Sequence, residues 1–244
     1  MENGFRILAL ACAFLVLALP TNHASAYWTG EDITESEFDA WPSFCKTGFL
    51  DSEFGARSRF RARLSQSARA ATPNKAIPGG HHFCIGLVAI NRSTSKSKDK
   101  AKDLMRTAAN EIGYSYSRMS LENPDFSLVS AYYGKALYGM GERQKGFDVW
   151  STAIRAQPSR RESYLLMTEA LISERRLDEA LRLLTDFDAT KDQPWPDAEY
   201  WLGYVYYEKG KHEEALKHVE QAIALGYPSD GLRKKILNSI ASRR

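Results

Sequence analysis

The sequence predicts an all-α solenoid of stacked helical hairpins, preceded by an irregular amino-terminal arm. Two observations lead to this prediction. From His81 almost to the end of the 244-residue chain, apolar residues recur at spacings of three and four, as they do on one face of an α-helix. In the second half of the chain, small residues also recur at separations of 34 and 35 residues, which is typical of a helical repeat.

The composition is that of a globular protein. Apolar residues make up 43% and charged residues 26% of the chain, values that exclude a mostly disordered chain, a collagen and a polytopic membrane protein. The 33 basic residues exceed the 30 acidic ones by only three, giving a net charge of +3. Since neutralising a phosphate backbone needs a much larger excess of basic residues, no nucleic acid partner is expected.

The first 26 residues have the three-part layout of a secretory signal. Arg6 precedes the apolar run Ile7–Leu19, and Pro20 leads to a small-residue site that ends at Ala26. The run of 13 apolar residues is short against the roughly 20 that span a bilayer. We therefore expect cleavage near Ala26, a periplasmic or secreted protein, and a mature chain with no transmembrane helix. A retained signal is the alternative, and it would place the protein in a membrane-associated complex.

Cleavage would leave two of the three cysteines in the mature chain. Cys12 lies in the apolar run and would leave with the signal, so that Cys45 and Cys84 remain. Two unaccompanied cysteines in an oxidising compartment predict a disulfide. Closing a loop of about 40 residues contributes roughly 3–4 kcal/mol in the chain-entropy model.

Residues 27–80 form the predicted arm. They begin acidic, continue through a basic stretch around Arg57–Arg69, and end in the turn-rich Pro78-Gly79-Gly80. Weak periodicity predicts an irregular segment with one short helix at about residues 58–70. Because its apolar content is too low for it to fold alone, we expect the arm to pack along the helical part, pinned through Cys45.

A helical hairpin is predicted at residues 81–126. Apolar residues recur at helical spacing in 81–93 and again in 98–118, with a polar linker between them. We interpret this hairpin as an amino-terminal cap or a degenerate repeat. Four lysines, from Lys96 to Lys102, lie at the start of the second helix of this hairpin. We interpret them as solvent-exposed residues of the first helical turns, and a docking patch for an acidic partner is the alternative.

Residues 127–229 contain three equivalent units. Gly134, Thr168 and Gly203 hold the same place in successive units, and small residues follow twelve positions later, where two helices of a unit would cross closely. Bulky residues four positions further on would fill the groove against the next unit. The small residues are Gly146, Ala180 and Ala215, and the bulky ones are Trp150, Leu184 and Val219.

This pattern resembles the tetratricopeptide repeat family. The third unit carries the resemblance best, through Trp201-Leu202-Gly203, Tyr206, Gly210, Ala215 and Ala222. The second unit departs most, with Thr168 in place of glycine and Phe187 in place of the last alanine. The resemblance implies a right-handed superhelix, closed here by a cap helix in residues 230–244 with a polar outer side.

The resemblance also implies a concave face, lined by the first helix of each unit, that holds a peptide or protein partner. Aromatic side chains are frequent at binding hot spots. Packing between units is the alternative role, and we assign Trp201 and Tyr206 mainly to it. The partner-binding residues expected on this face are Tyr132, Lys135, Tyr138, Glu169, Tyr200, Tyr204 and Tyr207. Leu165, Ile172 and Trp201 occupy the remaining inward positions.

We therefore expect an exported, non-catalytic scaffold that acts in secretion or envelope assembly. No phosphate-binding loop, nucleophile elbow or zinc-protease motif occurs, so neither an enzyme nor a cofactor is expected. The alternative is a metal- or haem-binding protein that uses His81, His82 and Cys84. A disulfide at Cys84 would remove the thiolate that this alternative needs.

Overall fold

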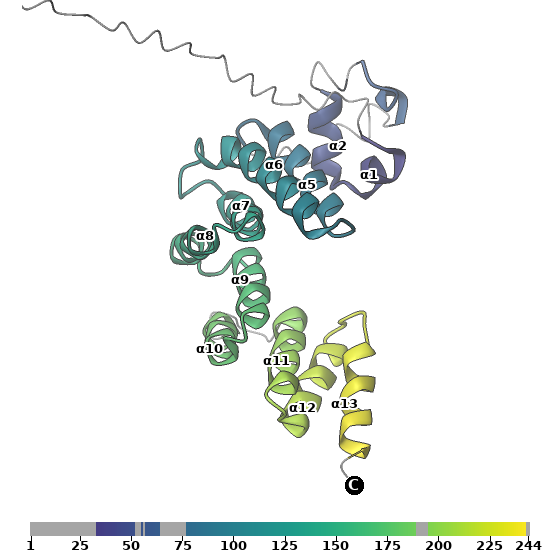
Figure 1. Ribbon diagram of the computed structural model, residues 1–244, viewed down its shortest axis with the longest axis vertical. Helices are drawn as coiled ribbons and strands as arrows, with labels where there is room; N and C mark the ends of the chain where they lie inside the picture. The colour runs from purple at the N-terminus through teal and green to yellow at the C-terminus, as the bar shows by residue number, and fades with distance from the viewer. Residues whose placement is uncertain (1–32, 52–54, 56, 64–76, 189–194, 243–244) are drawn as a thin grey trace, which may run out of the picture.

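The computed structural model describes residues 33–51, 55, 57–63, 77–188 and 195–242. Within these ranges every regular element is a helix, and the predicted all-α solenoid is confirmed (Figure 1). The predicted signal at residues 1–26 lies outside the described residues. In the described part of the chain, none of the helices is both long and apolar enough to span a bilayer.

Successive helices pair into hairpins, and the hairpins stack along one direction (Figure 1). An amino-terminal pair is followed by three repeat units and a single closing helix. The helices are α5 (Gly80–Ser93) with α6 (Lys98–Tyr116), α7 (Phe126–Met140) with α8 (Arg143–Ala156), α9 (Glu162–Ser173) with α10 (Leu177–Asp188), α11 (Pro196–Glu208) with α12 (His212–Ala224), and α13 (Gly231–Ala241).

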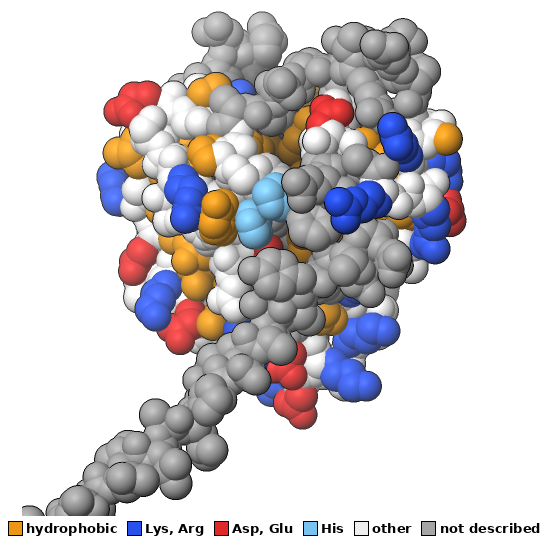
Figure 2. All heavy atoms as spheres, turned by 90° about the horizontal axis from the view of Figure 1, so that it is seen from above, with side chains coloured by type: hydrophobic (Ala, Val, Ile, Leu, Met, Phe, Trp, Pro, Cys, Tyr) orange, Lys and Arg blue, Asp and Glu red, His pale blue; other side chains and the backbone are white. Residues whose placement is uncertain are grey.

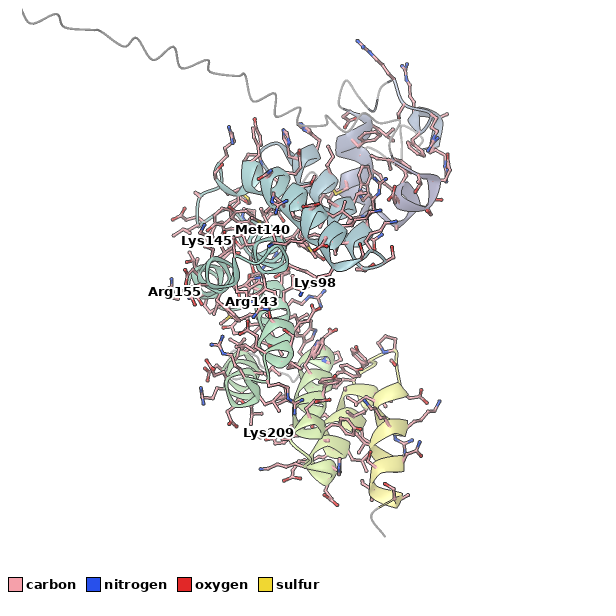
Figure 3. The ribbon with its side chains drawn as sticks, viewed as in Figure 1. Lys98, Met140, Arg143, Lys145, Arg155 and Lys209 are labelled. Carbon is pink, nitrogen blue, oxygen red and sulfur yellow. A yellow bond between two sulfur atoms is a disulfide. The ribbon has the colours of Figure 1, made fainter. Side chains whose placement is uncertain are left out.

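The two helices of a unit lie on different sides of the stack. The first helices α7, α9 and α11 contact one another in succession. The second helices α8 and α10 lie on the outer side, and α8 presents Lys145 and Arg155 away from the arm (Figure 3). The row of first helices therefore forms a continuous face.

Close crossing of the two helices fixes the geometry of the first and third units. A Cβ atom at Gly134 would lie 2.4 Å from Nε1 of Trp150, and one at Gly203 would lie 2.4 Å from Cγ2 of Val219. Trp150 is also held by a 2.9 Å hydrogen bond from its Nε1 to the carbonyl of Ala131. Glycine is therefore required at these two positions by the contact between α7 and α8 and between α11 and α12.

The turns inside the units share one backbone conformation. Gly141, Arg175 and Gly210 occupy equivalent positions and have φ angles of 105°, 60° and 75°. Glycine adopts this left-handed region without a Cβ penalty. Arg175 adopts it in the second unit, whose sequence departs most from the pattern.

The arm is more regular than the sequence predicts. Residues Glu35–Ala40 form helix α1 and Ser43–Leu50 form α2, where we expected irregular chain. The prediction of a helix at residues 58–70 is wrong for residues 58–63, which contain only a short 3-10 turn, Arg61–Arg63. Residues 64–70 lie outside the described residues.

Local capping and aromatic packing explain the two short helices. The Thr34 side chain accepts from the Glu37 backbone N–H, while the Glu37 carboxylate accepts from the Thr34 N–H, a reciprocal cap of the first turn. Phe38 stacks on Phe60 with ring centroids 4.4 Å apart. Trp41 and Phe49 complete an aromatic cluster, their rings 5.4 Å apart. These aromatic side chains belong to the same buried cluster as Phe83 and Val88 of α5.

Two interactions fasten this arm to the solenoid. A disulfide joins Cys45 of α2 to Cys84 of α5, as the sequence predicts, with the two Cα atoms 5.6 Å apart. The Arg92 guanidinium of α5 binds the Glu37 carboxylate of α1 through two nitrogens, one at 2.7 Å. Both cysteines are buried, so the arm forms part of the amino-terminal core.

We expect Gly134→Ala to lower the free energy of unfolding by about 1–3 kcal/mol, because the added methyl group overlaps the buried Trp150 ring. Chemical denaturation followed by circular dichroism measures the change. Gly48→Ala is the matched control, since Gly48 is an exposed residue of α2 and its added Cβ meets no atom within 4 Å. This control should be neutral or stabilising by up to about 1 kcal/mol. Equal losses in both variants would contradict the close crossing.

Candidate partner-binding face

A cavity lies where the arm meets the solenoid, and we name it the arm pocket. It has a volume of about 410 Å³. The corner between α1 and α2 forms one wall, the carboxyl-terminal half of α5 forms a second, and α7 forms the third. Its apolar lining includes Trp41, Pro42, Leu87, Val88 and Tyr132, and its polar lining includes Glu37, Asn91, Thr94 and Lys135.

A second cavity of about 340 Å³ lies between α7, α9 and the start of α11, and we name it the repeat pocket. Its lining combines aliphatic and charged side chains. It is lined by Leu128, Ala131, Tyr132, Arg161, Glu162, Leu165, Leu166 and Asp197.

Helix α7 separates the two pockets with one stripe of side chains. Leu128, Ala131, Tyr132 and Lys135 are spaced by three, one and three residues, which places them on the same face of the helix. Tyr132 lines both pockets and is therefore the partition between them. Its ring packs edge-on against Phe83 of α5 at 5.9 Å, and burial raises the pKa of its hydroxyl. The hydroxyl therefore stays neutral at physiological pH.

Many of the charged side chains on this face form ion pairs. Lys135 Nζ lies 3.1 Å from Oε2 of Glu169, which joins α7 to α9. Arg161 Nη1 lies 3.9 Å from Asp197, and its guanidinium stacks over Trp195 at 4.6 Å. Together with the Glu37–Arg92 pair, these contacts leave a face whose charges are largely balanced.

The other predicted tyrosines lie further along the first helices and are more involved in packing. The Tyr138 hydroxyl bonds Ser173 at 2.8 Å and Glu174 at 3.2 Å, across the α7–α9 boundary. Tyr200, Tyr204 and Tyr207 are partly buried against the cluster of α12 and α13. Tyr200 stacks on Tyr227 at 4.1 Å, Trp201 lies 5.7 Å from Tyr204, and Lys235 lies 4.9 Å over the Tyr207 ring.

The structure therefore separates the predicted binding residues into two groups. Tyr132 and Lys135 line pockets, and Glu169 holds Lys135 in place. The tyrosines of α11 contribute to the core between the third unit and the closing helix. The sequence pattern missed Trp41, Leu87 and Asn91, because their part in the arm pocket depends on contacts between segments that are distant in the chain. Only the Cys45–Cys84 pairing indicated that the arm lies against α5.

The metal-binding alternative is not supported by the geometry. Cys84 is bonded to Cys45, and His82 Nδ1 lies 2.6 Å from Oε2 of Glu111. Burial lowers the pKa of His81. Across the residues that the structure describes, no three histidine, cysteine or acidic side chains gather to hold a metal ion. Histidine side chains at the amino-terminal end lie beside hydrophobic ones (Figure 2).

Comparison with known proteins agrees with the repeat architecture. Residues 196–226 match the family model of the tetratricopeptide repeat, and these residues form the α11–α12 hairpin and the turn after it. By this match the third unit is a tetratricopeptide repeat. The match falls on the third unit, where Gly203 and Ala215 retain the small residues of the helix crossing.

Two solved structures are also similar to this chain over part of its length. A thermophilic tetratricopeptide protein of Thermus thermophilus is 16% identical over 66% of this chain and 92% of its own, with a TM-score of 0.45. A structure of MamA from MSR-1 is 17% identical over 78% of this chain and 92% of its own, with a TM-score of 0.43. No curated protein sequence matches the chain. These similarities do not indicate a function for this chain.

We expect Glu37→Gln to lower the free energy of unfolding by about 1.5–3 kcal/mol at pH 7, because it removes a charge-assisted hydrogen bond to Arg92. Hydrogen bonds from Arg92 lower the pKa of the Glu37 carboxyl from 4.5 to about 2. A lowered folded-state pKa stabilises the fold above the unfolded value, and this contribution is lost as the pH falls toward 2.

Urea denaturation of wild type and variant between pH 7 and pH about 2.5 measures this dependence. The difference between the two proteins should shrink as the pH falls below about 4.5. A difference that stays constant over this range would contradict the assigned ion pair.

Proposed function

We propose that this repeat protein is an exported, non-catalytic scaffold that binds a peptide or protein partner on the face formed by its first helices. The observation that carries the proposal is the pair of pockets on either side of Tyr132. Their volumes, about 410 and 340 Å³, lie within the range of about 300–1,000 Å³ that ligand sites occupy. Together they extend from the arm to the second repeat unit.

The chemistry of the lining supports a protein partner. Trp41, Leu87 and Tyr132 offer apolar and aromatic contact area in one pocket, and Leu165 and Leu166 do so in the other. Partly buried aromatic side chains lose little entropy on binding and are enriched at interface hot spots. Lys135 and Asn91 add polar groups that can orient a bound segment.

The proposed compartment is the periplasm or the exterior of the cell. It is supported by the signal-like residues 1–26 and by the buried disulfide, which is typical of an oxidising environment. In that compartment a scaffold would serve secretion or envelope assembly. The disulfide also removes Cys84 from nucleophilic chemistry, since no thiolate can form there.

We expect Asn91→Trp to reduce partner capture at least tenfold, because the indole would fill the arm pocket. Asn91 is exposed, so no core side chain is lost. Crosslinked affinity capture of the tagged protein from its native envelope, followed by mass spectrometry, measures the amount of each partner.

Asn110→Trp is the matched control, since Asn110 is an exposed asparagine of α6 that lines neither pocket. It should leave capture unchanged. Both variants should keep the helical content and melting temperature of wild type. Equal capture by wild type and both variants would refute the proposed binding face.

A further inference from the structure

We infer that the junction between the first turn of α5 and the end of α6 is a pH-sensitive device, in which a proton taken up by His81 opens this turn. The turn carries Phe83 and leads directly to Cys84, so its opening acts on the place where the arm, α5 and α7 meet. This inference concerns the order of α5 and does not depend on the proposed binding face.

Four planar side chains form a stack at this junction. The His81 and His82 rings of α5 have centroids 4.2 Å apart, and the Tyr114 ring of α6 lies 4.1 Å from that of His82. The Arg118 guanidinium, just after α6, lies 3.6 Å from the centroid of the Tyr114 ring. Two imidazoles and a guanidinium are therefore gathered in one small cluster.

The stack supports the turn that precedes α5. Gly79 is the residue before this helix and has a φ of 60°, and a Cβ atom there would lie 2.5 Å from Cε1 of Tyr114. The Ser115 hydroxyl donates a 3.1 Å hydrogen bond to the Gly79 carbonyl. Gly79 has no side chain that could cap the first backbone N–H groups of α5. The start of α5 is therefore held by its contacts with the end of α6.

One positive charge on the two histidines is compensated, and a second is not. His82 Nδ1 lies 2.6 Å from Oε2 of Glu111, so this carboxylate compensates a charge on His82. A charge on His81 would lie beside His82 and in the first turn of a helix, where the helix dipole disfavours cations. Among the described residues, α2 and α7, which also pack against α5, contribute no charge that acts on His81.

Protonation of His81 therefore destabilises the closed turn. Burial, and then the charge of His82, lower the pKa of His81 from its usual 6.5, while the charge of Glu111 opposes them. Because this pKa is lower in the folded chain, the closed turn takes up the proton less readily than the opened turn. The stabilisation is complete above pH about 6.5 and is lost as the pH falls through the folded pKa.

Phe83 connects this turn to its surroundings. The Phe83 side chain is completely buried, and its ring lies 6.3 Å from that of Phe44 in α2 and 5.9 Å from that of Tyr132 in α7. The next residue, Cys84, is bonded to Cys45 and stays attached to α2. The opening is therefore limited to the first turn, and it releases the contacts of the Phe83 ring with both helices.

Amide hydrogen exchange of the purified, oxidised full chain, measured by NMR, tests this inference. In an α-helix the amides of Cys84, Ile85 and Gly86 donate to the carbonyls of residues 80–82, so they report on the first turn. We expect their protection factors to fall at least about threefold between pH about 7.5 and about 5. The amide of the buried Trp150 in α8 is the internal reference and should show no such fall.

Two matched variants separate the roles of the histidines. His81→Phe keeps a planar ring beside His82 but takes up no proton, so its protection factors should stay constant within about twofold over this pH range. His82→Phe removes the neighbouring charge, so the imidazole signals of His81 should titrate at a higher pH than in wild type. Melting temperatures at pH about 7.5 show whether each variant is folded.

In wild type, the imidazole signals of His81 and the protection factors should change with the same midpoint. Separate midpoints, constant protection factors in wild type, or an equal fall at Trp150 would overturn the inference. A fall in His81→Phe as large as that in wild type would do the same. If a variant does not fold, the agreement of the two midpoints in wild type decides the question.

Discussion

The close crossing of the two helices in each unit is the constraint on which the rest of this structure depends. At Gly134 and Gly203 a methyl group would overlap Trp150 and Val219, so glycine on the first helix makes room for a bulky buried side chain of the second. This contact fixes the angle at which each hairpin presents its first helix. Repetition of the unit then lines up α7, α9 and α11 as one face, and the α7 stripe with Tyr132 follows from that alignment.

The arm adds what the repeats alone do not supply. The Cys45–Cys84 disulfide and the Glu37–Arg92 ion pair hold α1 and α2 against α5, and the corner between these short helices closes one side of the arm pocket. In the described residues, the arm therefore forms one wall of the arm pocket. Reduction of the disulfide, or acidification toward the Glu37 pKa of about 2, would each release one of these two connections.

The sequence predicts the parts of the structure that rest on local periodicity. The separations between Gly134, Thr168 and Gly203 predict the solenoid. The inward-facing positions derived from them include Tyr132 and Lys135. The arm helices are missed because each is too short to show a helical period, and the only local sign is Thr34 with Glu37 three residues later. The arm pocket could not be predicted, because its walls come from three segments that only the tertiary fold brings together.

Site-specific photocrosslinking in the native cell tests the central claim, that partners bind on the face divided by Tyr132. A photoreactive benzoyl-phenylalanine is placed at Asn91 in the arm pocket, at Leu165 in the repeat pocket, or at Asn110 on α6, one position at a time. The account predicts that the same partner is crosslinked from the first two positions and not from the third. Crosslinks from Asn110 alone, or equal crosslinks from all three positions, would contradict it.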